Sequence, residues 1–332
     1  MTTRPRLRGL AALLAAALTL GVTACGSNDD SSSSSSGSTP AGTTAPAGTT
    51  TSTGSSLPGK GKPAVTMGDK NFTEQYILGE LYKQALEAKG FTVNLKANIG
   101  SSEITDKALT SGKIDFYPEY TGVIAIELAK GDPKNPPKTA DETYTAAKEF
   151  EAGRGFTTLD KTPFFDADGL AVKPAYADKY GLTTVGDLKK AGKFSYGAPP
   201  ENKTRFQGVV GMKQVYGLTN LEFKPLAIGL QYNALDADKI DVAAVFTTDG
   251  QLASGKYKVL DDTEGIFGFQ NVTPVVKDSV LKAQGPAFAE TLNAVSAKLT
   301  NEAMQAMNAA VDLDKKKPAD VAKAFLSANG LV

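Results

Sequence analysis

The sequence predicts an α/β protein with two related lobes. Short apolar or alternating segments, typical of strands, are repeatedly followed by segments whose apolar residues recur three or four positions apart, as on one face of a helix. The same order of strands and helices returns in a second part of the chain. With 332 residues, the chain is long enough for two medium domains.

The first group of elements contains three predicted strands and two predicted helices. The first helix begins at Thr73, a residue that can cap a helix, and Gly90 stops it. The strands are expected at 65–67, 91–99 and 114–117, and the second helix at 102–109. Because a helix separates each strand from the next, we expect the strands to be parallel.

The second group repeats this order, with a strand at 193–197, a helix at 203–216 and a strand at 240–246. A short sequence echo supports two related lobes. Ser-Gly-Lys-Ile-Asp115, followed by Tyr-Thr-Gly122, is similar to Asp-Lys-Ile-Asp241, followed by Thr-Thr-Asp-Gly250. The C-terminal part is predicted to be helical, with apolar residues at helical spacing over 284–299 and 318–326.

The first 24 residues have the features of a signal peptide. Three arginines precede an apolar run of about 14 residues, which is shorter than the roughly 20 that span a bilayer. Small residues before Cys25, the only cysteine, resemble a bacterial lipobox, which implies a lipid anchor at Cys25 on the outer face of the cell membrane. An ordinary signal peptide with an incidental cysteine is the alternative. Residues 25–62 are rich in Ser, Thr, Gly, Pro and Ala and are expected to form a disordered linker.

The composition excludes several classes of function. The chain has no His and one Cys, so it lacks the residues of a Cys/His zinc site or of a Ser-His-Asp or Cys-His hydrolase. Its 36 Lys and Arg residues are balanced by 36 Asp and Glu residues, which argues against a nucleic-acid partner. These zinc and hydrolase chemistries are therefore excluded, and we expect no metal and no cofactor.

Polar residues follow two predicted strands where each leads into a helix. The first stretch is Gly-Asp-Lys-Asn-Phe-Thr-Glu-Gln75, which contains Lys70, and the second is Ala-Pro-Pro-Glu-Asn-Lys-Thr-Arg-Phe206, which contains Arg205. The carboxyl ends of strands in an open α/β sheet are the usual place for ligands, and helix amides there favour an anion. A basic residue at a helix start interacts unfavourably with the helix dipole, so helix stability does not explain Arg205. Its position therefore indicates a role in binding a ligand. For the first stretch there is an equal alternative to ligand binding. Its polar residues could only cap the helix, with Lys70 exposed to solvent.

Four motifs together resemble a known family. Lys-Asn-Phe-Thr-Glu-Gln75, Ile-Asp-Phe-Tyr-Pro-Glu-Tyr-Thr-Gly122, the Arg205 segment and Thr-Thr-Asp-Gly250 resemble the substrate-binding proteins of ABC importers for glycine betaine, choline and related osmoprotectants. The resemblance covers 65–330. It implies a type II periplasmic-binding-protein fold, with a ligand cleft between one lobe of residues 63–167 and 271–332 and another of residues 168–270.

The resemblance also implies a set of ligand-binding residues. In this family a Lys and an Arg hold the ligand carboxylate, which matches Lys70 and Arg205, while aromatic rings surround the quaternary ammonium. Tyr120 matches one ring and Phe246 another, but Asp168 and Gln270 replace two more. Val123 also replaces a carboxylate-binding Thr. The predicted ligand-binding residues are Lys70, Asn71, Gln75, Tyr120, Asp166, Asp168, Arg205, Phe246 and Gln270.

The two missing rings bear on which ligand is bound. Glycine betaine is the most favoured named ligand, but Asp166 and Asp168 would suit an amine with N–H donors better than one with three methyl groups. A polar amine or an amino acid is therefore the alternative. The resemblance implies that the protein is a monomer. It also implies that its partners are the ligand and the permease and ATPase subunits of the importer.

Two other functions use the same residues or the same fold. A glycosidase could use Glu119, Asp166 and Asp168 as paired carboxylates, and it would turn over a sugar substrate. A receptor lipoprotein could have kept the two lobes without transport, and the absence of neighbouring permease and ATPase genes would favour it.

Overall fold

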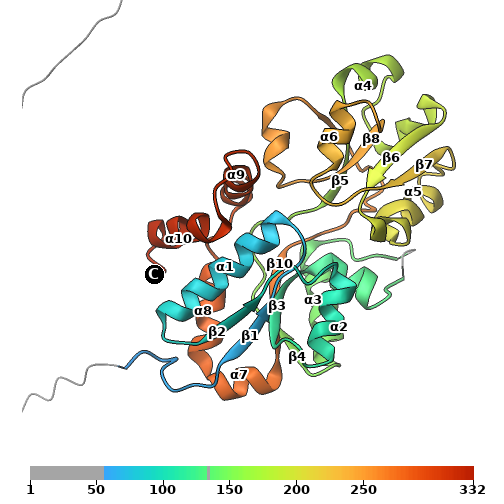
Figure 1. The fold of residues 1–332 in the computed structure, drawn as a ribbon. Coiled ribbons are helices and arrows are strands. Elements are labelled where there is room, and N and C mark those ends of the chain that lie inside the picture. Colours follow the sequence, from blue (N-terminus) through green and yellow to red (C-terminus); the bar gives the residue numbers. More distant parts are fainter. Residues whose placement is uncertain (1–55, 133–134) are drawn as a thin grey trace, which may run out of the picture. The chain divides into compact units, whose positions relative to one another are not determined.

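Two five-stranded sheets organise the chain in the computed structural model, which describes residues 56–132 and 135–332 (Figure 1). The first sheet, with its helices, is lobe 1, and its strand order is β2-β1-β3-β10-β4. The second sheet, with its helices, is lobe 2, with the order β7-β6-β8-β5-β9. The strands are β1 Val65–Gly68, β2 Val93–Lys96, β3 Phe116–Tyr120, β4 Phe156–Thr158, β5 Asp168–Val172, β6 Phe194–Ala198, β7 Leu221–Pro225, β8 Val242–Phe246, β9 Lys258–Leu260 and β10 Val272–Lys277.

The α/β fold class is confirmed, and the strands that the sequence predicted are parallel within each lobe; the antiparallel strands β5 and β10 were not predicted. β1, β2 and β3 are parallel, as are β6, β7 and β8, whereas β10 runs antiparallel to β3 and β5 runs antiparallel to β8. β5 and β10 are the strands by which the chain enters a lobe from the other one. They start at the edge where the parallel strands end, so they must run the opposite way.

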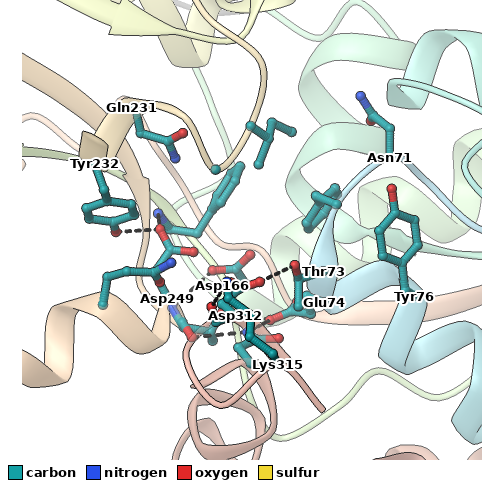
Figure 2. Close-up of a pocket in the computed structure, with 17 residues that line it drawn as sticks. Asn71, Thr73, Glu74, Tyr76, Asp166, Gln231, Tyr232, Asp249, Asp312 and Lys315 are labelled. Atoms are coloured by element: carbon teal, nitrogen blue, oxygen red, sulfur yellow. Dashed lines mark hydrogen bonds between the residues drawn. The ribbon is translucent and has the colours of Figure 1, made fainter. Parts of the chain in front are cut away.

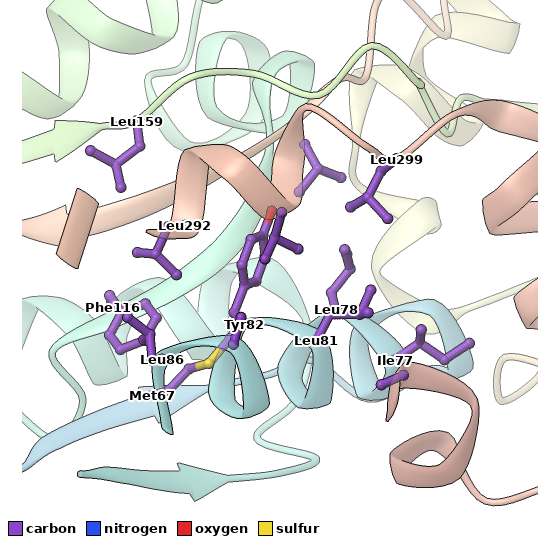
Figure 3. Packing of buried hydrophobic residues seen from close by; sticks show 14 of the residues in the cluster. Met67, Ile77, Leu78, Leu81, Tyr82, Leu86, Phe116, Leu159, Leu292 and Leu299 are labelled. Atoms are coloured by element: carbon purple, nitrogen blue, oxygen red, sulfur yellow. The ribbon is translucent and has the colours of Figure 1, made fainter. Parts of the chain in front are cut away.

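Lobe 1 contains the longest helices of the described residues. Its helices are α1 Thr73–Ala88, α2 Ser102–Thr110, α3 Ala140–Ala152, α7 Asp278–Gln284, α8 Pro286–Ser296, α9 Asn301–Asp312 and α10 Pro318–Ala328, with a π-helical turn, η1 Val123–Leu128. α1 packs against α8, α9 and α10 in the core shown in Figure 3. Tyr82 is fully buried there, and its hydroxyl lies 2.8 Å from Ser296 Oγ. Burying each large apolar side chain stabilises the lobe by about 1.5–3 kcal/mol.

Lobe 2 has shorter helices, and the predicted helix at 203–216 is wrong. The elements are α4 Pro174–Tyr180, η2 Val185–Ala191, η3 Pro200–Lys203, η4 Phe206–Val210, α5 Gly211–Gln214, α6 Gln231–Asp236 and η5 Gly250–Ser254. The backbone leaves the helical region at Gly208, with φ −137° and ψ −133°. A Cβ at this position would lie 2.2 Å from the carbonyl oxygen of Asn202, so the close approach requires glycine and interrupts the helix.

Other predicted elements are present with shifted bounds. The strand predicted at 91–99 is shorter, because Asn98 adopts a φ of +58° and its N–H donates to Asp69 Oδ1 at 2.6 Å. The strand predicted at 114–117 begins and ends later, as β3. The remaining predicted strands correspond to β1, β6 and β8, and the other predicted helices correspond to α1, α2, α8 and α10.

The sequence echo is confirmed as a structural repeat. Asp115 and Asp241 each precede the middle strand of a sheet. Asp115 Oδ2 accepts a hydrogen bond from the backbone N–H of Thr66 in β1, and Asp241 Oδ2 accepts one from Ser195 in β6, both at 2.8 Å. The same side chain thus ties together equivalent strands in the two lobes.

The lobe limits predicted at 167/168 and 270/271 lie within the two crossing segments, between β4 and β5 and between β9 and β10, and they stay a prediction. The predicted signal peptide and Cys25 lie outside the described residues. Residues 57–62 differ from the predicted disordered linker, because they form a turn in which Gly59 N–H donates to Lys89 O at 2.9 Å. Within 56–132 and 135–332, no helix combines the length and apolarity needed to cross a membrane.

Candidate functional site

Both lobes contribute side chains to one cavity. It is lined by eight of the predicted residues, namely Lys70, Asn71, Tyr120, Asp166, Asp168, Arg205, Phe246 and Gln270. Lys70 and Asn71 follow β1, Tyr120 and Phe246 end β3 and β8, and Arg205 follows β6. The parallel strands therefore bring these residues together at their carboxyl ends.

Lys70 is buried in lobe 1 with its charge already matched. Its ammonium forms an ion pair with the buried carboxylate of Glu119 and donates to Ser102 Oγ at 3.0 Å. It also lies 4.2 Å from the ring centroid of Tyr120. Burial lowers the pKa of Lys70, and the Glu119 carboxylate opposes that shift. A ligand carboxylate at Lys70 would share the ammonium with Glu119.

Arg205 reaches from lobe 2 to lobe 1. Its Nε and Nη2 donate to the two carboxylate oxygens of Glu103, on α2, each at 2.9 Å. Burial alone would raise the pKa of Glu103, but the hydrogen bonds from Arg205 outweigh it and hold the pKa at about 2. Sequence reasoning missed Glu103, because an acidic residue in the first turn of a helix is common on any protein surface.

Three aromatic rings form a stack across the two lobes. Phe72, the N-cap residue of α1, lies between the rings of Tyr120 and Phe246, with centroid distances of 6.2 Å and 5.4 Å and interplanar angles of 24° and 21°. Sequence reasoning missed Phe72, although it stands in the motif Lys-Asn-Phe-Thr-Glu-Gln75. The predicted loss of two rings is therefore partly offset by a ring from α1. Phe165 and Phe269 are instead 46% and 37% exposed and do not line this cavity.

Of the carboxylates at the site, Asp166 is buried and Asp168 is half-buried. Asp166 lies in the first crossing segment, and its Oδ1 accepts from the backbone N–H of Thr248 at 3.2 Å. Burial raises the pKa of Asp166, and the neighbouring carboxylates of Glu74 and Asp249 raise it further. Burial also raises the pKa of Asp168 to about 6, against the attraction of Arg205. These groups attract a cation once they ionise.

The two predicted glutamines mainly support other groups. Gln75 is fully buried and does not line the cavity, and its Oε1 accepts from the backbone N–H of Lys70 at 3.4 Å. Gln270 does line the cavity, but its Oε1 accepts from Val123 N–H at 3.1 Å and its Nε2 donates to Phe267 O at 3.4 Å. Gln270 therefore secures the second crossing segment against lobe 1.

The carboxylate set considered for glycoside hydrolysis does not converge on the cavity. Glu119 is absent from the residues that line it, and its Oε1 accepts from both Lys70 Nζ and the backbone N–H of Tyr120. A substrate in the cavity would meet Asp166 and Asp168 without Glu119.

A second cavity adjoins the first and shares five lining residues with it (Figure 2). Its volume is about 250 Å³. The shared residues are Asn71, Phe72, Asp166, Ile228 and Phe246. Across the described part of the chain, no group of His, Cys, Asp and Glu side chains is placed to hold a metal ion.

Known proteins resemble this chain in sequence and in fold. Residues 63–328 match the family model described as the substrate binding domain of an ABC-type glycine betaine transport system. A glycine-betaine-binding protein of Pseudomonas aeruginosa is 31% identical over 278 residues, which cover 80% of this chain and 88% of that protein. The carnitine transport binding protein OpuCC of Listeria monocytogenes is 30% identical, over 82% of this chain and 90% of that protein. A crystal structure described as a glycine betaine/carnitine/choline ABC transporter is 28% identical, with a TM-score of 0.65 over 80% of this chain and 99% of that one. These similarities confirm the family resemblance and the fold that the motifs indicated.

Proposed function

The chain belongs to the family of substrate-binding domains of ABC-type glycine betaine transport systems, and on that premise we propose that it captures a small organic amine for an ABC importer. The ligand is a quaternary or zwitterionic amine of the glycine betaine or choline type. The observation that carries the proposal is the stack of Tyr120, Phe72 and Phe246, which draws rings from both lobes into one cavity.

The rings bind the cationic part of the ligand, and the two basic residues bind its carboxylate. Each ring face attracts an organic cation by about 0.5–2 kcal/mol, depending on how far the cation is desolvated. A ligand carboxylate binds Arg205, whose guanidinium has N–H donors beyond the two that Glu103 accepts. Lys70 adds positive charge on the lobe 1 side, shared with Glu119.

Ligand binding stabilises the contact between the lobes. In addition to the Arg205–Glu103 pair, Thr248 Oγ1 donates to Glu74 Oε2 at 2.6 Å. The backbone N–H of Gln207 donates to Glu127 Oε1 at 3.1 Å. A ligand that touches both lobes favours the conformation in which these bonds exist, and the membrane subunits recognise that conformation.

Isothermal titration calorimetry tests the ligand class. Glycine betaine, choline, carnitine, proline betaine and polar amino acids are titrated into the protein, and we expect heat from at least one quaternary amine. Tyr120→Ala should abolish that heat, whereas Phe165→Ala, which removes an exposed ring outside the cavity, should leave it unchanged. Absence of heat from every quaternary amine would remove this ligand class. Mass spectrometry of the recovered ligand should show it chemically unchanged, as expected for a binding protein without enzymatic activity.

The protein acts outside the cytoplasm as a monomer, anchored by a lipid on Cys25, with the linker as a tether. The sequence before Cys25 supports this part of the proposal, because it resembles a lipobox. Cells fed a labelled fatty acid should incorporate the label into the wild-type protein and not into Cys25→Ser, which should be released from the membrane. Equal membrane association of both forms would contradict the lipid anchor.

A further inference from the structure

The second cavity is distinctly acidic. Four carboxyl side chains line it, those of Glu74, Asp166, Asp249 and Asp312, against a single basic side chain, that of Lys315. Lys315 is exposed, and its Nζ donates to the backbone oxygen of Asp312 at 2.5 Å. Figure 2 shows these groups around the cavity, with Asp249 beside Tyr232.

The carboxyl groups are held in place by hydrogen bonds from both lobes. Glu74 Oε1 accepts from the Tyr120 hydroxyl at 2.8 Å, and its Oε2 accepts from Thr248 Oγ1 and from Asn308 Nδ2. Both hydrogen bonds of Asp249, from the Tyr232 hydroxyl at 2.6 Å and from Phe246 N–H at 2.9 Å, end on Oδ2. The positions of Glu74 and Asp249 are therefore defined.

Two buried amide side chains at the cavity have acceptor oxygens without donors. Gln231 is 2% exposed and Asn308 is 3% exposed, and both line the cavity. Within the described part of the chain, Gln231 Oε1 and Asn308 Oδ1 have no hydrogen-bond partner. Figure 2 shows the Gln231 amide directed from α6 into the cavity. Buried acceptors of this kind are stabilised by a guest that donates N–H groups.

A quaternary ammonium cannot satisfy these acceptors, because it has no N–H to donate. A primary ammonium has three donors and a guanidinium has five, and either also matches the acidic charge. In the neighbouring ring-lined cavity, the two basic residues Lys70 and Arg205 are paired with Glu119 and Glu103. Once the carboxyl groups of the second cavity ionise, the charge left unmatched over the two cavities is therefore mainly negative.

We propose that the acidic cavity is a second binding subsite, which takes a primary ammonium or guanidinium group of an extended ligand whose other end lies among the three rings. The proposal rests on the proposed function and specifies its ligand class. Asp249 and Gln231 are the residues that select N–H donors, and the shared wall of Phe72 and Phe246 lies along the stem of the ligand.

Calorimetry with two matched dications tests the subsite. 1,4-Diaminobutane and its bis-trimethylammonium counterpart, tetramethonium, have the same spacing and charge and differ in N–H donors. We expect 1,4-diaminobutane to bind the full-length protein about tenfold more tightly than tetramethonium, as one charge-assisted hydrogen bond would give. Glycine betaine and choline are titrated in parallel to report the ring-lined cavity.

Four variants, one of them a control, locate the effect. Asp249→Asn removes the charge and keeps an oxygen for both bonds on Oδ2, and Gln231→Leu removes the acceptor. Each should weaken 1,4-diaminobutane about tenfold and change choline less than about threefold. Glu222→Gln, which neutralises a carboxylate on the surface strand β7, is the control and should change neither. Gln231→Glu, which adds a charge at the same place, should increase the affinity for 1,4-diaminobutane. A gain in affinity at this position shows that the loss in Gln231→Leu is not caused by misfolding.

The outcomes separate the two proposals. If a quaternary amine binds through Tyr120 but 1,4-diaminobutane gives no heat, or binds equally well to all variants, the subsite is wrong and the proposed function stands. If Asp249→Asn weakens binding and Gln231→Leu does not, charge alone attracts the ligand and the selection for N–H donors is wrong. If no quaternary amine and no diamine binds, the proposed function fails as well.

Discussion

The two lobes have the same strand order, yet they support the site in different ways. In lobe 1, the partners of Lys70 and Tyr120 belong to lobe 1 itself, since Lys70 pairs with Glu119 and the Tyr120 hydroxyl donates to Glu74. In lobe 2, Arg205 and Thr248 have their partners in lobe 1. Lobe 1 therefore carries a half-site that its own contacts preorganise, whereas the half-site of lobe 2 is completed only where the lobes meet.

The local structure at the two strand ends matches this difference. β1 leads into α1, a continuous helix of 16 residues that holds Glu74 and Gln75 in its first turns. β6 leads into a 3₁₀ turn, a kink at Gly208 and the four-residue α5. The continuous helix α1 holds the buried side chains of lobe 1 in fixed positions. The interrupted helical segment after β6 leaves Arg205 with an extended backbone, from which its side chain reaches lobe 1.

The largest effect is expected from removing a charge inside lobe 1. Lys70→Ala leaves the Glu119 carboxylate fully buried without its cation, so the free energy of unfolding should fall by about 3–5 kcal/mol. Urea denaturation followed by circular dichroism measures it. Arg205→Ala is the matched control and should cost less than about 1 kcal/mol, because the Glu103 side chain it leaves is 45% exposed. Equal losses for the two variants would contradict the difference between the lobes.

Arg205→Ala should instead weaken ligand binding. If Arg205 binds the ligand carboxylate in a buried contact, the affinity for glycine betaine should fall by about 2–5 kcal/mol. Choline has no carboxylate, so its affinity should change much less. Calorimetry of both ligands with the wild type and the variant measures this. An unchanged affinity for glycine betaine would show that the carboxylate lies elsewhere.

Gly250→Val should hinder the contact between the lobes. A Cβ on Gly250 would lie 2.5 Å from the Cα of Ala309 in α9, so the larger residue forces η5 away from α9. We expect ligand affinity to fall by about 1–3 kcal/mol, with a larger radius of gyration in X-ray scattering of the liganded protein. Gly153→Ala, whose Cβ would lie 3.5 Å or more from its neighbours, is the control. A normal affinity in Gly250→Val would mean that this contact is not needed for binding.

The smallest effect is expected from pH. Burial raises the pKa of Asp168 to about 6 and that of Asp249 to about 7. Both carboxyl groups are protonated at pH 5 and ionised at pH 8, so cation affinity should rise over this range by about tenfold, or ~1.4 kcal/mol. Calorimetry at four pH values measures it, and the rise should be smaller in Asp249→Asn. Affinity that falls with rising pH would contradict the role of these carboxylates.

Stability has the opposite dependence on the same two groups. Because the pKa of Asp249 is raised in the folded protein, its contribution to stability is full below the unfolded pKa of about 4 and is lost as the pH rises through about 7. The free energy of unfolding of the wild type should therefore decrease relative to Asp249→Asn between pH 5 and pH 8. A constant difference would show that Asp249 titrates normally.

Much of the fold could be predicted because its signals are local. Apolar residues three or four positions apart predicted the helix that begins at Thr73, and two of them, Ile77 and Leu81, lie on its buried face. The echo around Asp115 and Asp241 predicted two related lobes. The helix expected at 203–216 was wrong, because the apolar pattern continues through Gly208 while the backbone packs on Asn202. A contact between Gly208 and a backbone atom of the preceding turn leaves no trace in the spacing of the apolar side chains.

By itself, the sequence determined the alternation of strands and helices, the polar residues at the strand ends, and the motifs that identify the family. Only the tertiary structure decided that Glu103 is the partner of Arg205, that Phe72 completes the ring stack, and that the acidic second cavity adjoins it. The reason is physical. Periodicity and capping depend on neighbours within a few residues, whereas Arg205 and Glu103 are 102 residues apart and meet only because two separately formed lobes pack against each other.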